Sequence, residues 1–110
     1  MLQFNNTALI QTMKKSNTNN WNQHLKQLCQ GLLTIKTDKE MQKFLIDLCT
    51  KTELQAMSER LQAAKLIKKG TPYREISKQT GLSTTTVTRI ANWIKGGEQG
   101  YNLVIDRLEK

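Results

Sequence analysis

The stretch that decides the fold is residues 71–95, which read TPYREISKQTGLSTTTVTRIANWIK. It predicts a short helix over residues 72–80 and a second helix over residues 84–95, which Gly96 and Gly97 end. Gly81 lies between the two helices and can adopt the positive φ that a tight connection needs. Two short helices joined through a glycine turn form a helix-turn-helix.

The residues around this turn meet the packing requirements of the motif. Thr71 and Pro72 precede the first helix as a hydroxyl N-cap and a proline at the first helical position, where the missing N–H costs nothing. Small Ser77 is expected where the two helices approach each other closely, with apolar residues on either side of the turn, Ile76 and Leu82. The second helix is expected to direct two residues to the core, Val87 and Ile90.

The formal net charge of +8, from 17 Lys and Arg against nine Asp and Glu, is concentrated in the same region. Residues 65–95 contain one acid, Glu75, and seven basic residues: Lys65, Lys68, Lys69, Arg74, Lys78, Arg89 and Lys95. Localised positive charge suits a polyanion, because each neutralised phosphate releases condensed counterions. Composition alone leaves open a solvated lysine face that serves solubility.

The start of the second predicted helix is rich in hydroxyls, which come from Ser83, Thr84, Thr85, Thr86 and Thr88. Threonine is a poor helix former, and no acid occurs between Glu75 and Glu98. Hydroxyls contact phosphates, and threonine methyls pack on the thymine methyl of the major groove. We interpret this end of the helix as a DNA-reading face. The alternative is that Ser83 is only an N-cap and that the threonines have no function.

Three amphipathic helices are predicted between Trp21 and Gly70, which is expected to end the third in a left-handed conformation. Their apolar stripes are Leu25, Leu28, Cys29, Leu32 and Leu33, then Met41, Phe44, Leu45, Leu48 and Cys49, then Leu54, Met57, Leu61, Ala64 and Ile67. Capping boxes at residues 37–40 and 50–53 open the second and third helices. The chain is therefore expected to be all-α, with both cysteines as buried thiols.

The composition indicates one helical domain over residues 21–110, preceded by a flexible N-terminal tail, residues 1–20, rich in Asn and Thr. Apolar residues make up 37% of the chain, which is few for a monomer, and small chains with thin cores often dimerise. No segment approaches the roughly 20 apolar residues of a membrane span, and no secretory signal is present. We expect a cytoplasmic protein with no membrane partner.

Catalytic and metal chemistry find little support in the sequence. Two cysteines and one histidine, His24, show no metal-ligand spacing, so neither a metal nor a cofactor is expected. A Ser-His-Asp set, paired catalytic carboxylates and a phosphate loop are all missing from the sequence, which argues against an enzyme. RNA binding stays open, although the chain offers no aromatic platform for stacking bases.

The residues quoted above resemble a known family. The block of residues 48–95 resembles the Trp repressor superfamily through Thr50, Glu53, Ala56, Arg60, Gly70, Arg74-Glu75, Gly81 and Thr86-Val87-Thr88-Arg89. Residues 21–110, including Asp47-Leu48-Cys49-Thr50 and Tyr101 through Asp106-Arg107, are more similar still to its YerC/YecD branch. The resemblance implies a six-helix subunit that intertwines with a second copy into a homodimer. Its helix-turn-helix, at about residues 71–95, would then read half-sites about one DNA turn apart.

The same resemblance implies DNA-binding roles for individual residues. Arg74 matches an arginine that reaches a guanine, Thr86 matches a phosphate contact, and the base-facing positions match Thr84, Thr85 and Thr88. Lys78, Ser83 and Arg89 complete the candidate DNA-binding set. One residue is missing between Gly70 and Gly81 relative to the repressor, so the match of Arg74 and Lys78 can shift by one position.

For the effector pocket, the resemblance implies Thr50, Arg60 and Arg89, since arginines pair bidentately with the carboxylate of tryptophan. Where the repressor has a glycine and a serine, however, this chain has Ile90 and Trp93, and both add bulk at the ligand position. Tryptophan is therefore not expected to be the effector, and the Trp93 ring is expected to fill part of its space. Arg60 and Arg89 would then contact phosphates or pair with acids such as Glu53 or Glu59.

Together these interpretations predict a bacterial, sequence-specific DNA-binding transcription regulator. It is expected to be a homodimer, to act on double-stranded DNA as a repressor without tryptophan as corepressor, and to lie at the nucleoid when bound. Two alternatives stay open. One is a helix-turn-helix that serves as a protein-interaction module, and the other is a repressor that responds to tryptophan or to another small ligand.

Overall fold

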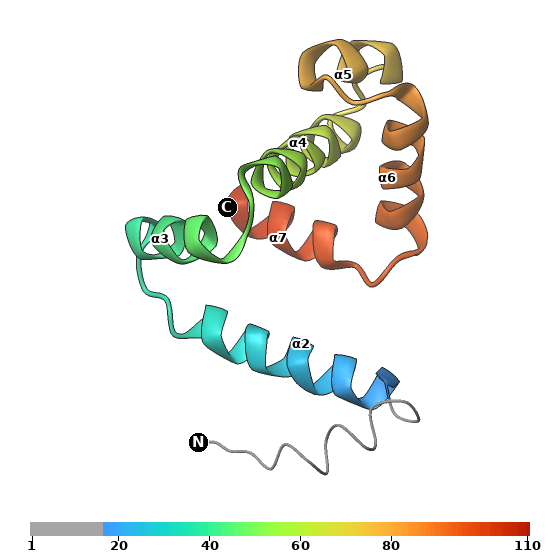
Figure 1. Cartoon of the computed structure of the whole chain (residues 1–110). Helices are drawn as coiled ribbons and strands as arrows, with labels where there is room; N and C mark the ends of the chain where they lie inside the picture. Colours follow the sequence, from blue (N-terminus) through green and yellow to red (C-terminus); the bar gives the residue numbers. More distant parts are fainter. Residues whose placement is uncertain (1–16) are drawn as a thin grey trace, which may run out of the picture. The chain divides into compact units, whose positions relative to one another are not determined.

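The computed structural model describes residues 17–110, which form six helices and no strand (Figure 1). The helices are α2 (Asn17–Leu33), α3 (Asp38–Leu48), α4 (Lys51–Lys68), α5 (Tyr73–Thr80), α6 (Thr84–Gly96) and α7 (Gly100–Leu108). The all-α, six-helix prediction is confirmed. Most of the expected tail lies outside the described residues, and α2 begins at Asn17, four residues before the predicted helix start at Trp21.

The described residues divide into two compact units, a first that ends at Phe44 and a second over residues 45–110. In the first unit, α3 begins after Thr37, whose hydroxyl accepts a hydrogen bond from the Glu40 amide at 3.1 Å. The Glu40 carboxylate, however, accepts from the Lys36 amide at 2.9 Å, one residue before the N-cap. The first predicted capping box thus forms on its hydroxyl side, whereas its carboxylate reaches one residue further back.

The apolar stripes predicted for α2 and α3 stay open in the single chain. Trp21 is 63% exposed and Leu33 is 83% exposed, and α3 has no buried residue. The predicted burial of both thiols is wrong, because Cys29 is exposed and Cys49 is only half-buried. An amphipathic helix buries its stripe only against another apolar element, and several residues of these stripes, among them Leu25, Leu28 and Leu33, stay exposed.

The second unit is built on α4. Both ends of this helix have the capping structures that the sequence predicts. The Thr50 hydroxyl accepts from the Glu53 amide at 3.1 Å, and the Glu53 carboxylate accepts from the Thr50 amide at 2.7 Å, so the second predicted capping box is complete. Gly70 ends the helix with a φ of 84°, as predicted. The Gly70 amide donates to the Ile67 carbonyl, and the Thr71 amide donates to the Leu66 carbonyl. These two hydrogen bonds form a Schellman motif.

The predicted Thr71 N-cap is wrong, because the Thr71 amide belongs to the end of α4. Pro72 is extended, with a ψ of 143°, and is itself the N-cap of α5 without a side-chain cap. Its carbonyl accepts the first helical hydrogen bond, from the Ile76 amide at 3.0 Å. Proline suits this position as well, since its missing N–H has no acceptor there. The helix-turn-helix therefore spans α5 and α6, residues 73–96.

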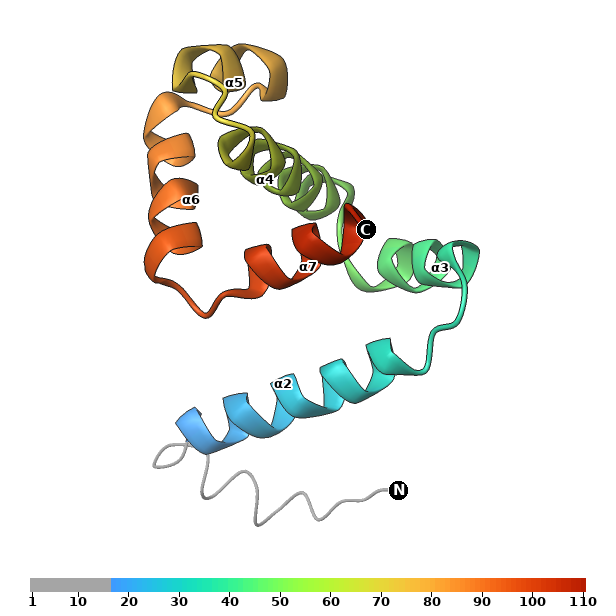
Figure 2. The same cartoon turned by 180° about the vertical axis from the view of Figure 1, so that it is seen from behind.

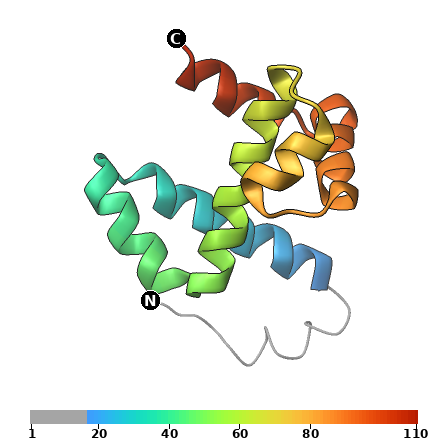
Figure 3. The same cartoon turned by 90° about the horizontal axis from the view of Figure 1, so that it is seen from above.

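The core of this unit joins all four of its helices through fully buried side chains: Ala63, Ala64, Ile76, Val87, Ile90 and Ile105. The predicted inward positions Ile76, Val87 and Ile90 are confirmed. In Figures 1 and 2, α5 lies across one end of α4 and α6, and α7 returns from the other end of α6 toward α4. Figure 3 shows α5 next to both α4 and α6. The start of α6 is thus presented beside α5.

The connection between α6 and α7 depends on a close approach at Gly97. Its amide donates to the Trp93 carbonyl at 2.8 Å, and a Cβ at this position would lie 2.6 Å from that same oxygen. We expect Gly97→Ala to lower the free energy of unfolding by about 1–3 kcal/mol, because the backbone must shift to relieve the overlap. Urea unfolding at a fixed protein concentration measures this.

Gly96→Ala is the matched control for Gly97→Ala. Its added Cβ meets nothing within 4 Å, and the residue is helical, so its stability should stay equal or rise by up to about 1 kcal/mol. Equal losses in the two variants would contradict the close-approach explanation.

Candidate nucleic-acid interface

The turn between α5 and α6 is locked by four hydrogen bonds of hydroxyl and backbone groups. Gly81 has a φ of 83°, and its amide donates to the Ser77 carbonyl at 2.9 Å. The Ser77 hydroxyl donates to the Leu82 carbonyl across the turn. The Thr80 hydroxyl, which is 8% exposed, donates to Ile76 at 2.8 Å and accepts from the Leu82 amide at 3.2 Å. The two helices are therefore held together without relying on side-chain packing alone.

The first turn of α6 has its own hydroxyl cap. The Ser83 hydroxyl accepts from the Thr86 amide at 3.1 Å and donates to the Thr86 hydroxyl at 3.0 Å. Ser83 therefore has the N-cap role that the sequence predicts as the alternative to a DNA-contacting role. The cap orders the helix start, where backbone amides and the positive end of the helix dipole favour a phosphate.

Thr84, Thr85 and Thr88 lie on the exposed surface of the same helix. The Thr88 hydroxyl donates to the Thr84 carbonyl at 3.0 Å, one turn earlier. Within residues 17–110, the hydroxyls of Thr84 and Thr85 make no hydrogen bond, so both can donate and accept toward a ligand. The exposed methyl groups of the three threonines add a small apolar surface.

Exposed cations accompany these hydroxyls. Arg74 and Lys78 lie four residues apart on α5, where together with Glu75 and Ser77 they line a shallow hollow of about 430 Å³. The Glu75 carboxylate is engaged by Gln79 at 3.0 Å. Arg89 is exposed on α6. The predicted DNA-binding residues therefore lie on the two helices of the motif, apart from Ser83 at the N-cap of α6, and the hollow between Arg74 and Lys78 suits a phosphate group.

The residues predicted for an effector pocket occupy different environments. The Thr50 hydroxyl caps α4, Arg60 is half-buried on the same helix, and Ile90 is fully buried in the core. Arg89 and Trp93 are exposed on α6. Of these five residues, only Trp93 lines the hollow beside α7, and the structure does not gather the other four around that hollow.

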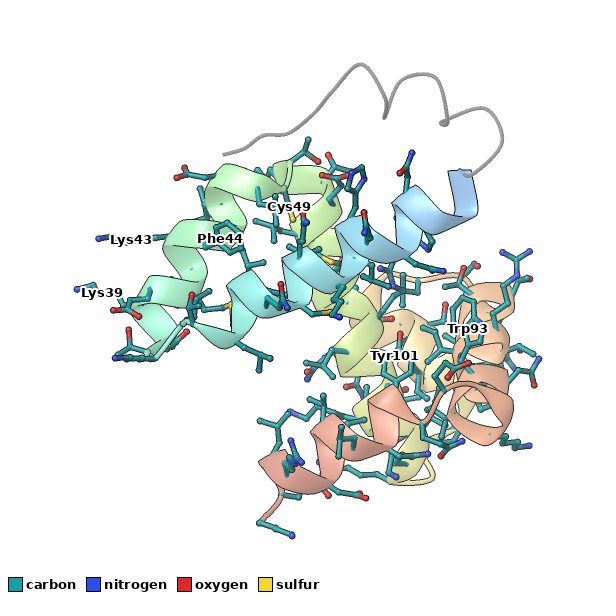
Figure 4. The ribbon with its side chains drawn as sticks, turned by 90° about the horizontal axis from the view of Figure 1, so that it is seen from below. Lys39, Lys43, Phe44, Cys49, Trp93 and Tyr101 are labelled. Carbon is teal, nitrogen blue, oxygen red and sulfur yellow. The ribbon has the colours of Figure 1, made fainter. Side chains whose placement is uncertain are left out.

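That hollow has a volume of about 730 Å³ and an apolar lining. It lies between α4, α6 and α7 and is formed by Leu61, Trp93, Gly97, Glu98, Gly100, Tyr101 and Val104. Figure 4 shows Trp93 on α6 and Tyr101 on α7, the two aromatic residues of the lining. Trp93 is 52% exposed, so its ring forms an open wall of this space instead of filling a closed one.

The acids suggested as partners for the two arginines have other contacts. The Glu53 carboxylate completes the capping box, and Glu59 accepts from Gln55 at 3.1 Å. The ion pair found in the described part of the chain joins Lys68 and Asp106 at 3.6 Å. Arg60 and Arg89 are thus left without an acidic partner within residues 17–110, which leaves their guanidinium groups available to a ligand anion.

Two other findings concern the whole described part of the chain. In residues 17–110, no three His, Cys, Asp or Glu side chains are grouped as metal ligands would be. Nor does any helix of that part have the length and apolar character needed to cross a membrane.

Sequence reasoning missed the residues that hold the motif in place. Thr80 was assigned no role, although a hydroxyl residue directly before a turn glycine is a usable signal for a bond back to the helix. Asn102 on α7 was missed as well. Its amide nitrogen donates to the Ile94 carbonyl at 3.0 Å, and its amide oxygen accepts from Lys68 at 2.6 Å. No local pattern indicates contacts over such distances along the chain.

The sequence is similar to a known protein family and to a curated protein. The profile of the family described as Trp repressor protein matches residues 23–109. YerC of Bacillus subtilis (strain 168), a protein described as uncharacterized, is 34% identical over 86 residues, which cover 78% of this chain and 83% of YerC.

Solved structures are similar too. A TrpR-like protein from Eubacterium eligens ATCC 27750 has a TM-score of 0.76 and 34% identity, over 79% of this chain and 90% of that one. A candidate Trp repressor from Staphylococcus aureus has a TM-score of 0.74 and 37% identity, over 78% of this chain and 86% of that one. The predicted resemblance in sequence and fold is confirmed.

The buried Thr80 hydroxyl provides a test of the locked turn. We expect Thr80→Val to lower the free energy of unfolding by about 1–3 kcal/mol, because the Leu82 amide loses its acceptor in a partly buried place. Thr85→Val removes the same group from an exposed helix position and should change stability by no more than about 0.5 kcal/mol. Chemical unfolding compares both variants with the unmodified chain, and equal effects would contradict the role of Thr80.

Proposed function

Because the chain belongs to the Trp repressor family of regulators, we propose that it is a homodimeric, sequence-specific DNA-binding transcription regulator that acts as a repressor. Its partner is double-stranded DNA, which α5 and α6 contact. A DNA partner places this activity in the bacterial cytoplasm, at the nucleoid when bound. The proposed role is one of binding and regulation, with no enzymatic step.

The observation that carries this proposal is the ordered, acid-free start of α6. Ser83 caps the helix, so Thr84 and Thr85 project from a rigid first turn, and the next exposed side chains are Thr88 and Arg89. A helix of this kind suits the major groove, where its first residues meet base edges. In this proposal Thr84, Thr85 and Thr88 face bases, while Thr86 and Ser83 approach the phosphate next to the helix start.

Basic residues of both α5 and α6 supply the remaining contacts with DNA in this proposal. Arg74 reaches a guanine, since an arginine fork matches the two acceptors on its major-groove edge. Lys78, one helical turn further along, and Arg89 on α6 neutralise phosphates. Such contacts fix the position of the protein on the duplex but do not read the sequence.

The dimer is supported by large apolar side chains that stay exposed in one copy outside the helix-turn-helix: Trp21, Leu25, Leu28, Leu33, Ile46, Leu48, Met57, Leu103, Val104 and Leu108. They come from α2, α3, α4 and α7, while the helix-turn-helix exposes Tyr73 on α5 and Trp93 on α6. Monomeric soluble proteins rarely expose this much apolar surface, and a second identical chain is the simplest cover for it. Two copies also give two reading heads, as a palindromic site requires.

We propose that the regulator does not need tryptophan as a corepressor. Ile90 takes part in the core, and the exposed Trp93 ring borders the hollow beside α7. In this chain both positions carry larger side chains than a tryptophan site would accept. Arg60 and Arg89 then contact phosphates instead of a ligand carboxylate.

A salt titration with duplex DNA tests the proposal. If phosphates are neutralised as proposed, the affinity should fall by about a thousandfold between 50 and 200 mM salt, because a dimer with six or more phosphate contacts releases that many counterions. The absence of binding at low salt would overturn the proposal. That result would favour the rival function, in which the exposed apolar faces bind another protein.

Arg74→Ala tests base recognition. On the duplex that the protein prefers, the variant should bind more weakly by about 1–3 kcal/mol, since one bidentate base contact per subunit is lost. Arg107→Ala, which removes the same charge from the exposed end of α7, is the control and should keep the ratio between preferred and random duplex. An unchanged ratio in Arg74→Ala would assign that arginine to a phosphate instead.

Isothermal calorimetry with L-tryptophan tests the effector. The full chain should give no heat beyond dilution, because Ile90 and Trp93 occupy the positions that would surround the indole and the amino group. Micromolar binding would contradict this and would support a tryptophan-responsive repressor. Binding after Trp93→Ser, but not before it, would show that the bulk of Trp93 excludes the ligand.

A further inference from the structure

A hydrogen-bonded cluster around Asn102 joins three helices of the second unit. The Asn102 amide nitrogen donates to the Ile94 carbonyl at 3.0 Å and to the Gln99 side-chain oxygen at 2.7 Å. The Asn102 oxygen accepts from the Lys68 ammonium at 2.6 Å, and that ammonium also lies 3.6 Å from Asp106. One half-buried side chain thus connects the last turn of α4, the last turn of α6 and the first turn of α7.

The contact with Asn102 gives the Ile94 carbonyl a hydrogen-bond donor that the helix itself does not supply. The last carbonyls of an α-helix lack amide partners of their own, and Ile94 lies in the last turn of α6. The Gly97 amide bonds to Trp93, and Asn102 supplies the donor for Ile94. The C-terminal end of α6 is therefore tied by a side chain that itself binds α4.

The connection that leads to α7 depends on the same residue. Gln99 has a φ of 70°, a left-handed conformation that is uncommon for a residue other than glycine and needs support from its surroundings. Its side chain accepts from Asn102, which is three residues further along the chain. Loss of the Asn102 amide thus removes a support from this connection as well as the link to α6.

The orientation of α6 relative to α4 decides where the start of α6 lies. On α4 the fully buried positions are Ala63 and Ala64, and Leu61, Leu66 and Ile67 pack against the same core. The ten helical rises from Thr84 to Ile94 span about 15 Å, so a tilt of about 10° moves the start of α6 by about 3 Å, one hydrogen-bond length. A contact that fixes the end of α6 therefore controls what its start can reach.

We propose that Asn102 is a positioning residue for DNA recognition. By holding Ile94 to Lys68, it sets the orientation of α6, and with it that of the locked α5–α6 pair, relative to α4. Asn102 lies on α7, which leaves α6 at the end opposite to Thr84 and Thr85, so it acts through α6 and not by touching DNA. This inference rests on the proposed function, but its effect on helix orientation is measurable without DNA.

The test compares Asn102→Ala with Asn92→Ala in the full chain. Both asparagines lie inside helices, so both variants gain helix propensity, and the exposed Asn92 side chain makes no hydrogen bond within residues 17–110. Residual dipolar couplings of the backbone amides measure the orientation of α6 relative to α4. Affinities for the preferred and for a random duplex are measured at a temperature where all variants are fully folded.

In Asn102→Ala, the residual dipolar couplings of α6 should change relative to those of α4. The ratio of the affinity for the preferred duplex to that for a random duplex should fall by about fivefold to tenfold, as expected for one lost hydrogen-bonded link per subunit. Binding to random duplex should stay within about twofold, since phosphate contacts tolerate a small tilt. Asn92→Ala should match the unmodified chain in both measurements.

Asn102→Asp provides a second variant should Asn102→Ala fail to fold. It keeps the acceptor for Lys68 and places a carboxylate in the first turn of α7, which is favourable there, but it cannot donate to Ile94. The same change in couplings and in the affinity ratio is expected. Unchanged couplings together with an unchanged ratio, even with a lower melting temperature, would overturn the positioning role. If the unmodified chain does not distinguish duplexes, the proposed function fails, and the couplings alone decide the role of Asn102.

Discussion

The closed turn between α5 and α6 is the constraint on which the rest of the structure depends. Gly81 makes the reversal possible through its left-handed backbone, and the hydroxyls of Ser77 and Thr80 satisfy the backbone groups that the reversal would leave unpaired. Because the turn is closed from within, α5 and α6 can pack on α4 as one body. The exposed sides of both helices are then free to carry hydroxyls and cations instead of residues that stabilise the fold.

The apolar residues fall into two groups, a small buried core and a larger set at the surface of the single chain. The four helices of residues 45–110 share a small core of alanine, valine and isoleucine, which is enough to hold the helix-turn-helix. The larger apolar residues, including Trp21 and Leu33, stay at the surface of a single chain. The low apolar fraction and the exposed stripes have the same explanation under the proposed function, in which two copies share one core.

Much of the fold follows from local signals in the sequence. The Thr50–Glu53 capping box, the left-handed Gly70 and Gly81 and the inward positions of Ile76, Val87 and Ile90 all depend on residues within one helical turn of each other, so spacing predicts them. The start of α5 was predicted one residue early, because Thr71 has two possible roles and its amide bonds back to α4. Periodicity predicts apolar stripes on α2 and α3 that stay open in a single chain, because a stripe alone does not say what covers it.

The candidate site was only partly accessible to sequence reasoning. The exposed positions of Arg74, Lys78, Thr84, Thr85 and Arg89 agree with the prediction, whereas their contacts with DNA stay predictions. The Asn102 contacts join residues up to 34 positions apart, which neither propensity nor periodicity encodes. The DNA-reading role itself is tested most directly by selecting bound fragments from a pool of random duplexes. A homodimer with one helix-turn-helix in each subunit should enrich a palindromic sequence whose half-sites lie about 10 base pairs apart. Enrichment of no sequence, or of a single half-site without symmetry, would contradict it.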